Sequence, residues 1–363
     1  MHQGRSDLLA RLRVEDDDTV ADLMPTDGDG MSRAHLERWH AVLSGVAAAL
    51  VPGPRLVLVD GHEHSTVFAD RLCEHLTSVG QPSLRLSSPS FLNDGDGRQD
   101  LGGLSTIAIA DGAVWQPPDD RWDTMIWLRT AGPQPEHDAD MVVDLSDPTW
   151  PVIRHINPSL ADRRTWHLNE TRAFFAVRAA TWDAKFGDDL PAYAQAVADM
   201  GIPAGTVAID VGCGTGRALP ALRAATGTAG VVIGIDVTEQ MLAAARDHGR
   251  SGGAHLVLAD AGYLPLPDAS VDAVFTAGLI GHVPDVDPTL RELARVTREG
   301  GRLALFHPSG RAALAARHGR SLRPDEALAE RSLGDALGRT GWRAVRYDDA
   351  VHRFLALATR VAR

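Results

Sequence analysis

Val-Ala-Ile-Asp-Val-Gly-Cys-Gly-Thr-Gly, residues 207–216, is the stretch that decides the fold. Its apolar first half predicts a buried strand, its three glycines predict a tight turn, and a helix is expected over Arg217–Ala225. Glycine is needed where φ is positive and where the backbone must approach a ligand closely. A strand–turn–helix unit also aims free N–H groups at a polar ligand. The stretch therefore predicts a ligand-binding loop.

Three further apolar strands follow at regular intervals, over Val231–Asp236, His255–Asp260 and Val271–Ala277. Asp236 lies 20 residues after Gly216, where a doubly wound sheet places the carboxylate that accepts ribose hydroxyls. The glycine spacing is G-x-G-x-G and differs from the G-x-G-x-x-G of nicotinamide-binding folds. The series predicts a Rossmann-like α/β domain.

These motifs, in this order, resemble the class I S-adenosylmethionine-dependent methyltransferases over about residues 160–363. The matching residues are Asp210-x-Gly212-x-Gly214-x-Gly216, Asp236-x-Thr238-x-x-Met241-Leu242, Asp260-Ala261, Leu264-Pro265-Leu266-Pro267-Asp268 and Val271-Asp272-Ala273-Val274-Phe275. The resemblance implies a seven-stranded sheet in a methyltransferase domain at 201–363, with S-adenosylmethionine as the cofactor.

The resemblance also implies roles for single residues. Asp236 would bind the ribose hydroxyls, and Asp260 and Ala261 would meet the adenine with Met241 against its face. The glycines would let the backbone approach the methionine part, while Asp210 orders the loop or meets the ammonium through water. Trp182 would lie near the methionine part or serve only as core packing. The cofactor-binding set is Trp182, Asp210, Gly212, Gly214, Gly216, Asp236, Val237, Met241, Asp260, Ala261 and Ala277.

Two histidines are the candidate catalytic residues. A hydroxyl or acidic carbon acceptor needs a base with a near-neutral pKa, which histidine supplies. His282 and His307 follow the fourth and fifth strands, at the carboxyl ends where open sheets bind ligands. His167 is a weaker third candidate, and a carboxylate acceptor would need no base. The acceptor atom stays open.

Bulk composition narrows the partners. The formal net charge is −12 and no basic cluster stands out, which disfavours nucleic acid. No 18-residue apolar run and no signal peptide are evident, so we expect a cytoplasmic protein without a membrane span. Cys73 and Cys213 suggest neither a disulfide framework nor a thiolate metal site. His62-x-His64 reads as a polar turn rather than a metal site. A small organic acceptor is expected, and a homodimer is an open option.

The N-terminal half predicts a second α/β domain. After a helical segment at 1–54, with an amphipathic helix over 34–50, strands and helices alternate over 55–150 and predict a parallel sheet. This order resembles the uridine kinase branch of the P-loop kinases. The matching residues are Leu56-Val57-Leu58-Val59-Asp60-Gly61, Phe68-Ala69-Asp70-Arg71-Leu72, Ala110-Asp111-Gly112, Arg121-Trp122-Asp123-Thr124, Ala139-Asp140-Met141-Val142-Val143-Asp144 and Asp147-Pro148.

The kinase machinery is missing from this stretch. A P-loop reads G-x-x-x-x-G-K-[ST], but Gly61 is followed by His62-Glu63-His64-Ser65-Thr66. The chain's one lysine is Lys185, far outside the domain, and Ser87–Ser90 replace the usual acid. We therefore expect a kinase-like domain without kinase activity. Residues 151–200 are expected to be a linker and covering helices, over Glu170–Trp182 and Pro191–Met200.

Three functions remain in competition at this stage. The first is methyl transfer to a small organic molecule, with the N-terminal domain serving dimerisation, docking or lid support. The second is a bifunctional or nucleotide-binding protein that uses an unusual loop on a nucleoside-like ligand. The third is a non-enzymatic partner protein that binds S-adenosylmethionine.

Overall fold

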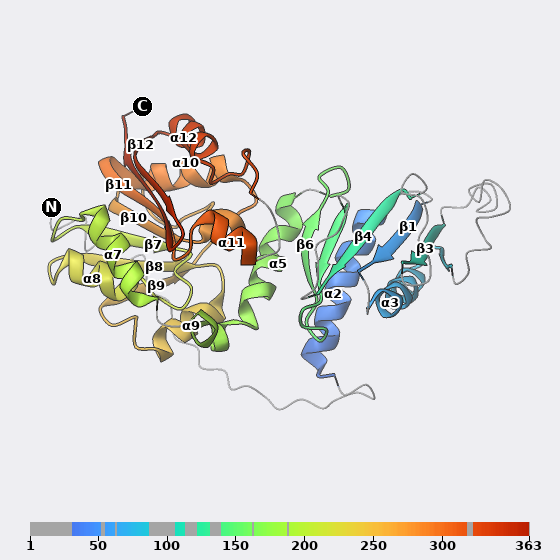
Figure 1. Cartoon of the computed structure of the whole chain (residues 1–363). Coiled ribbons are helices and arrows are strands. Elements are labelled where there is room, and N and C mark those ends of the chain that lie inside the picture. Colours follow the sequence, from blue (N-terminus) through green and yellow to red (C-terminus); the bar gives the residue numbers. More distant parts are fainter. Residues whose placement is uncertain are drawn as a thin grey trace. The chain divides into compact units, whose positions relative to one another are not determined.

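The computed structural model describes residues 31–51, 55–61, 64–86, 106–112, 122–130, 139–161, 163–186, 189–317 and 322–362. These residues form two compact units, one ending at Glu170 and the other beginning at Thr171 (Figure 1).

The N-terminal unit is built on a six-stranded sheet. Its strands are β1 (Arg55–Asp60), β2 (Ser83–Arg85), β3 (Ile107–Asp111), β4 (Thr124–Arg129), β5 (Met141–Asp144) and β6 (Val152–Ile156), in the order β2-β3-β1-β4-β5-β6. The first five are parallel, and β6 is antiparallel to β5. The parallel α/β sheet predicted over 55–150 is therefore confirmed. The resemblance to a kinase stays a prediction.

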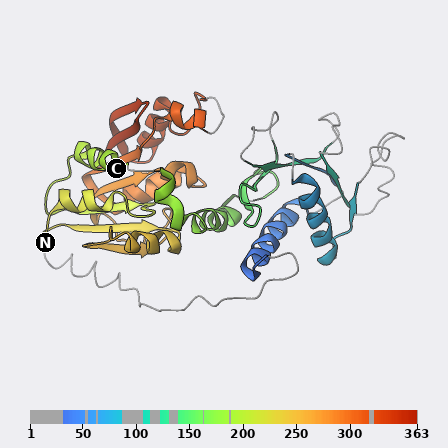
Figure 2. The ribbon, with the colours of Figure 1, turned by 60° about the horizontal axis from the view of Figure 1, so that its bottom comes forward.

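Two helices cover one face of this sheet, α2 (Arg33–Leu50) and α3 (Ser65–Ser78), as Figure 2 shows. Val42, Val46 and Leu50 of α2 are fully buried in the same apolar cluster as β1 and β3. Arg38 of α2 also forms a buried ion pair of 2.5 Å with Glu170. The helix expected over 34–50 is therefore part of this unit's core and not a separate 1–54 segment. Residues 1–30 lie outside the described chain.

The predicted linker 151–200 is divided differently in the structure. Val152–Ile156 completes the N-terminal sheet as β6, a strand that its mixed composition concealed. The single helix expected over Glu170–Trp182 is instead α5 (Arg163–Ala176), a 3₁₀ turn (Ala179–Thr181) and α6 (Trp182–Phe186). The Arg178 guanidinium donates to the Phe174 carbonyl at 2.8 Å, and the Arg178 amide bonds to Phe175. The side chain thus takes the carbonyl that a continuing helix would use.

The C-terminal unit contains the expected seven-stranded sheet. Its strands are β7 (Val207–Val211), β8 (Val231–Asp236), β9 (Ala254–Leu258), β10 (Val271–Ala277), β11 (Thr297–His307), β12 (Trp342–Ala350) and β13 (Arg353–Arg360), in the order β12-β13-β11-β10-β7-β8-β9. The final strand lies between β11 and β12 and is antiparallel to both. Strands β7 to β11 pair with one another in parallel, so their carboxyl ends share one edge.

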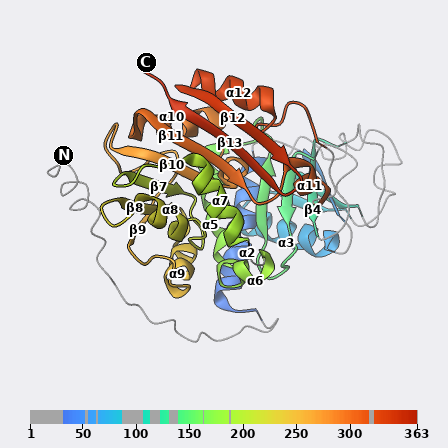
Figure 3. The ribbon, with the colours of Figure 1, turned by 60° about the vertical axis from the view of Figure 1, so that its left-hand side comes forward.

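Helices cover both faces of this sheet (Figure 3). The helices α10 (Val286–Val296) and α12 (Glu330–Arg339) pack in one apolar cluster. The helices α7 (Leu190–Met200) and α8 (Leu219–Thr226) pack in another. Shorter elements lie near the carboxyl edge, namely α9 (Glu239–Asp247), the 3₁₀ turn η4 (Leu279–His282) and α11 (Arg311–Arg317).

The helix α10 begins at Val286, and Asp285 is its N-cap. Asp287 lies in the first turn, where it pairs with Arg339 of α12 at 3.0 Å. That ion pair uses the carboxylate, so Asp287 supports helix packing instead of capping.

Across the described ranges, no helix is long and apolar enough to cross a membrane. The same residues contain no group of three or more histidine, cysteine, aspartate or glutamate side chains placed to hold a metal ion. His62 lies outside the described chain, and so do Glu63 and Ser87–Ser90.

Candidate functional site

The glycine loop, residues 212–216, follows β7 at the carboxyl edge of the sheet. Gly212, Gly214 and Gly216 have φ angles of 74°, 53° and 78°, which L side chains rarely adopt. The amides of Gly212 and Cys213 both donate to the Ile235 carbonyl, at 2.8 and 2.9 Å. These bonds fix the loop against β8.

The three glycines do not serve the same purpose. A Cβ on Gly216 would lie 3.0 Å from Leu219 and 3.1 Å from Ala245, and one on Gly212 would lie 3.1 Å from Leu279. A Cβ on Gly214 would meet only the sulfur of Met241, at 4.0 Å. Gly212 and Gly216 are therefore required by packing, whereas the space beside Gly214 is open.

Asp236 ends β8 and holds the same loop through its carboxylate. One oxygen accepts the Gly214 amide and the other accepts the Thr238 amide, each at 2.8 Å. Burial raises the pKa of Asp236, although the two backbone hydrogen bonds oppose that rise.

Asp210 lies inside β7, and its side chain is 2% exposed. Its Oδ1 atom is buried and has no hydrogen-bond partner. Burial and the nearby charge of Asp236 raise the pKa of Asp210 well above its usual value. A buried polar atom without a partner is costly, so this oxygen marks a position that a donor could satisfy.

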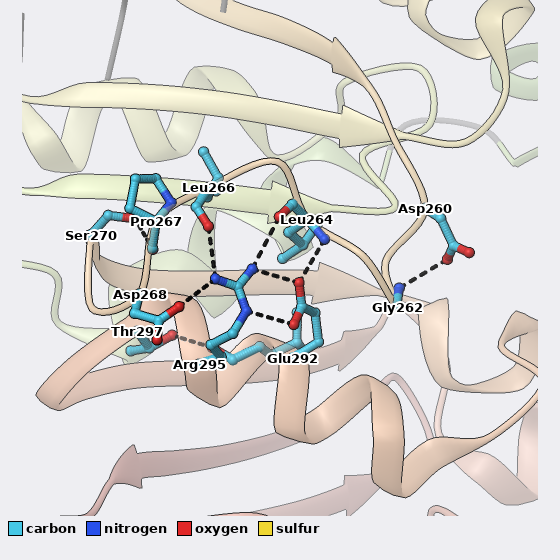
Figure 4. Close-up of polar contacts among 11 residues, drawn as sticks. Asp260, Gly262, Leu264, Leu266, Pro267, Asp268, Ser270, Glu292, Arg295 and Thr297 are labelled. Carbon is cyan, nitrogen blue, oxygen red and sulfur yellow. Dashed lines mark hydrogen bonds and ion pairs between the residues drawn. The ribbon is translucent and has the colours of Figure 1, made fainter. Parts of the chain in front are cut away.

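Asp260 and Ala261 follow β9, and the Asp260 carboxylate accepts the Gly262 amide at 2.9 Å (Figure 4). The chain then runs through Leu264–Asp268 without regular structure. Arg295 of α10 donates to the carbonyls of Leu266 at 2.8 Å and Leu264 at 3.0 Å. Figure 4 shows the guanidinium at the centre of these contacts.

Glu292 completes this clamp from the same helix. Its carboxylate accepts the Leu264 amide at 2.7 Å and binds Arg295 at 2.7 Å. Arg295 also pairs with Asp268 at 2.7 Å. The side chains of α10 thus take the place of the strand neighbours that the loop lacks. Sequence patterns did not predict this clamp, because Glu292 and Arg295 read as an ordinary polar helix face.

We use the name aromatic cover for three side chains, those of Phe174, Phe175 and Trp182. Phe175 and Trp182 pack against Met241, which is 1% exposed, together with Ala179 and Ala244. The Phe175 ring lies 5.5 Å from the Trp182 ring. Trp182 and Met241 therefore share one packing cluster, and their predicted contacts with the cofactor stay predictions.

His282 ends the 3₁₀ turn after β10 and lies under the aromatic cover. Its ring is 4.9 Å from the ring of Phe175 and 6.3 Å from that of Phe174. His307 ends β11, and its Nδ1 atom accepts the Ser309 amide at 3.0 Å. A Cβ on Gly278, which follows Ala277, would lie 3.9 Å from His307, so both histidines lie at the end of β10.

Two further residues that were predicted for the site are Val237 and His167. Val237 follows Asp236, and its carbonyl accepts the Arg172 side chain at 3.0 Å. His167 belongs to the N-terminal unit, where its ring lies 5.6 Å from that of Trp166. It is thus not among the residues that the C-terminal unit gathers.

A group of charged residues beside the glycine loop was not predicted as a unit. Asp183 of α6 accepts the Thr215 hydroxyl at 2.8 Å and pairs with Arg250 at 2.5 Å. Arg217 lies 3.4 Å from Asp183 and 3.0 Å from Asp189. The acid of Trp182-Asp183 was the one available signal, because Arg250 lies in a loop without a motif.

Part of the C-terminal unit is similar in sequence to known proteins. Residues 209–305 match a family model described as a methyltransferase domain. "Methyltransferase GfsG" of Streptomyces halstedii is 42% identical over 110 residues, which cover 29% of this chain and 39% of that protein. The "27-O-demethylrifamycin SV methyltransferase" of Amycolatopsis mediterranei is 41% identical over 106 residues, covering 28% and 38%.

A third relative is the "Demethylmenaquinone methyltransferase" of Staphylococcus aureus, which is 40% identical over 112 residues, covering 31% of this chain and 46% of the relative. The chain thus spans less than half the length of each of these curated relatives. The matched residues run from β7 to β11 and include the glycine loop, Asp236 and Asp260. Residues 209–305 are therefore similar to a methyltransferase domain, and they form the central strands of the seven-stranded sheet.

Proposed function

We propose that this protein transfers the methyl group of S-adenosylmethionine to a small organic acceptor. The observation that carries the proposal is the open space beside Gly214, next to the buried Asp236 carboxylate and the sulfur of Met241. A loop built only for packing would have side chains there, as it does at Gly212 and Gly216.

The described residues fit the cofactor in three respects. Asp236 places a carboxylate at the end of β8 beside the glycine loop, which suits the hydroxyls of a ribose. The partnerless Oδ1 of Asp210 suits a donor such as an ammonium or its bound water. The Arg295 clamp fixes the loop of Asp260 and Ala261, where we place the adenine. These assignments are our proposals.

The cofactor supplies an electrophilic methyl group on a sulfonium, and the protein's part is alignment of the acceptor. Positioning alone provides much of the rate in such displacements. The aromatic cover would exclude water and present flat apolar faces to the acceptor. His282 lies against two of its rings and is our first candidate for the base that takes the acceptor's proton.

His307 is the second candidate for the base. Its Nδ1 atom lies 2.9 Å from the Ser309 carbonyl oxygen and 3.0 Å from the Ser309 amide nitrogen, and these contacts orient the ring at the end of β11. The relatives named for 27-O-demethylrifamycin SV and demethylmenaquinone suggest organic acceptors of moderate size. We extend that class, and a role in secondary metabolism, to this protein as a proposal.

We further propose that residues 55–150 are kinase-like but not catalytic. Both oxygens of Asp111 are engaged within the unit: Ser65 donates to one at 2.5 Å, Thr66 donates to the other, and Arg85 pairs with it at 3.3 Å. Because the Ser65 and Thr66 hydroxyls already donate to Asp111, they are poor ligands for the Mg²⁺ of a magnesium–nucleotide complex. Titration of the full chain with Mg²⁺-ATP and Mg²⁺-GTP tests this, and nucleotide binding would favour the bifunctional alternative.

The central test is calorimetric titration of the full chain with S-adenosylmethionine and S-adenosylhomocysteine. Asp236→Ala should weaken binding by roughly 1–3 kcal/mol because ribose hydroxyls would lose their acceptors. Asp247→Asn, an exposed change on α9, is the matched control and should bind normally. Transfer of a labelled methyl group to a panel of small acceptors then separates an enzyme from a non-enzymatic cofactor-binding protein. Normal binding by the Asp236 variant would remove the ribose assignment.

A further inference from the structure

Asp183 joins α6, which carries Trp182 of the aromatic cover, to the loop that we assign to the cofactor. Its two oxygens contact Thr215 of the glycine loop at 2.8 Å and Arg250 at 2.5 Å. Arg250 in turn donates to the carbonyl of Thr215 at 3.1 Å and to its hydroxyl at 3.2 Å. The three residues therefore form a closed ring of polar contacts, and we call this ring the latch.

The latch is ionic and largely shielded from water. The side chains of Asp183 and Arg250 are 18% and 14% exposed. Burial raises the pKa of Asp183, but the hydrogen bonds from Thr215 and Arg250 and the charge of Arg217 outweigh burial, so that the pKa lies below its usual value. Asp183 thus carries its charge at neutral pH, and breaking the latch separates a charged pair.

The position of the latch connects it to the aromatic cover. Trp182 precedes Asp183 on α6 and packs against Met241, whose sulfur is the nearest atom to the open side of Gly214. Residues 179–186, which we call the covering segment, therefore pack on the cluster of Met241 beside the glycine loop and contact Thr215 of that loop through the latch. A ligand beside Gly214 would lie close to both.

We propose that Asp183 is a positioning residue that latches the covering segment onto the glycine loop and sets the rate at which the cofactor leaves. This inference rests on the proposed function, since it takes the glycine loop as the cofactor's site. The carboxylate acts through Thr215 and Arg250 and touches neither the cofactor nor the acceptor. A closed latch retains the cofactor during transfer, and an opened latch releases the spent cofactor.

Asp183→Asn is the informative change because it keeps the shape and the acceptor for Thr215 while removing the charge that holds Arg250. Asp199→Asn is the matched control. Asp199 also pairs with arginine, Arg353 at 2.8 Å, but it lies on α7 away from the glycine loop. The same charge is lost in both variants, so a general effect of charge or stability appears in both.

The first measurement needs no ligand. Hydrogen exchange of the full-length chain should become roughly tenfold faster in peptides covering 179–186 and 212–217 in Asp183→Asn only, because the latch no longer opposes local opening. Unchanged exchange in these peptides would overturn the latch, whatever the protein binds. A variant that is unstable everywhere would show faster exchange across the whole sheet as well.

The second measurement is the dissociation rate of S-adenosylhomocysteine, followed by tryptophan fluorescence in stopped flow. Asp183→Asn should raise this rate by about tenfold, because the latch no longer holds the covering segment on the glycine loop. Equal rates in wild type, Asp183→Asn and Asp199→Asn would refute the retention role. If the wild type binds neither S-adenosylmethionine nor S-adenosylhomocysteine, the proposed function fails, and the retention role fails with it.

Discussion

Alanine at Gly214 and at Gly216 should separate ligand approach from packing within one loop. Both glycines have positive φ angles, 53° and 78°, so the backbone strain that alanine introduces is similar at the two positions. Their surroundings differ. The added methyl group at Gly214 meets only the Met241 sulfur at 4.0 Å, whereas at Gly216 it lies 3.0–3.3 Å from three side chains.

The expected magnitudes follow from these contacts. The left-handed conformation costs alanine about 1–2 kcal/mol, which is the whole expected loss of stability for Gly214→Ala. Overpacking adds about 1–3 kcal/mol, so Gly216→Ala should lose about 2–5 kcal/mol. For cofactor binding the order reverses. The methyl group at Gly214 would occupy ligand space and cost about 1–3 kcal/mol, or roughly tenfold to a hundredfold in Kd.

Two assays on the full chain measure these quantities. Hydrogen exchange of the β8 peptide across a urea series reports the stability of the C-terminal unit alone, which a global unfolding curve of two units would not. Calorimetry reports the Kd for S-adenosylhomocysteine. The Kd of Gly216→Ala is measured at a temperature where the C-terminal unit is fully folded, so that its lower stability does not weaken the measured affinity.

One result would refute the argument. If Gly214→Ala bound the cofactor as wild type does, while losing only the expected stability, the open space beside Gly214 would not be the ligand's position. The assignment would then have to move to another part of the carboxyl edge. Equal stability of the two variants would show instead that Leu219 and Ala245 shift to admit a methyl group.

Three further outcomes are expected. His282→Ala should lower kcat by about 10²-fold or more with little change in the Kd of the cofactor, as single-turnover kinetics can show; an unchanged kcat would point to His307 or to an acceptor without a base. Arg295→Met should weaken cofactor binding and cost about 1–3 kcal/mol of stability, because the Leu264 and Leu266 carbonyls lose their donor; protection of the 260–268 peptide in hydrogen exchange checks this. Arg38→Met should destabilise the N-terminal unit by about 3–5 kcal/mol at pH 7 by leaving the Glu170 charge buried. Burial already raises the folded-state pKa of Glu170, so the folded unit holds that proton more tightly than the unfolded chain, and stability is gained as pH falls toward the ordinary glutamate pKa. The loss in Arg38→Met should therefore shrink in urea titrations at pH 5, and a loss independent of pH would contradict it.

Sequence patterns predicted the parallel strands of both units well, because buried parallel strands are short apolar runs between turn residues. Val152–Ile156 escaped prediction since Arg154 and His155 interrupt its apolar pattern. It is an edge strand, where one side of the ladder has no neighbour and polar residues are tolerated. The helix break after Ala176 was also missed, because the Arg178 side chain ends it and no glycine or proline marks the position.

The candidate site was predictable where a single short motif supplies its residues. Gly212 to Gly216 and Asp236 are such cases, since the loop and the strand end are local features. The latch and the Arg295 clamp were not predictable, because each joins residues that lie far apart in sequence. Thr215 and Arg250 are 35 residues apart, and Leu264 and Arg295 are 31 residues apart. Pairs of this kind become visible only when the fold brings the elements together.

The twofold hydrogen bonding of Asp236 bears on which adenosine compounds the loop admits. Its two oxygens already hold the Gly214 and Thr238 amides, so they remain acceptors with a fixed direction. An unmodified ribose brings two neutral donors to that direction, whereas a ribose that carries a phosphate brings only acceptors and negative charge. Under the proposed function, coenzymes phosphorylated on this sugar would be refused by repulsion alone, without any wall to block them. The carboxylate that shapes the loop would thereby also act as its filter against the phosphorylated coenzymes of the cell.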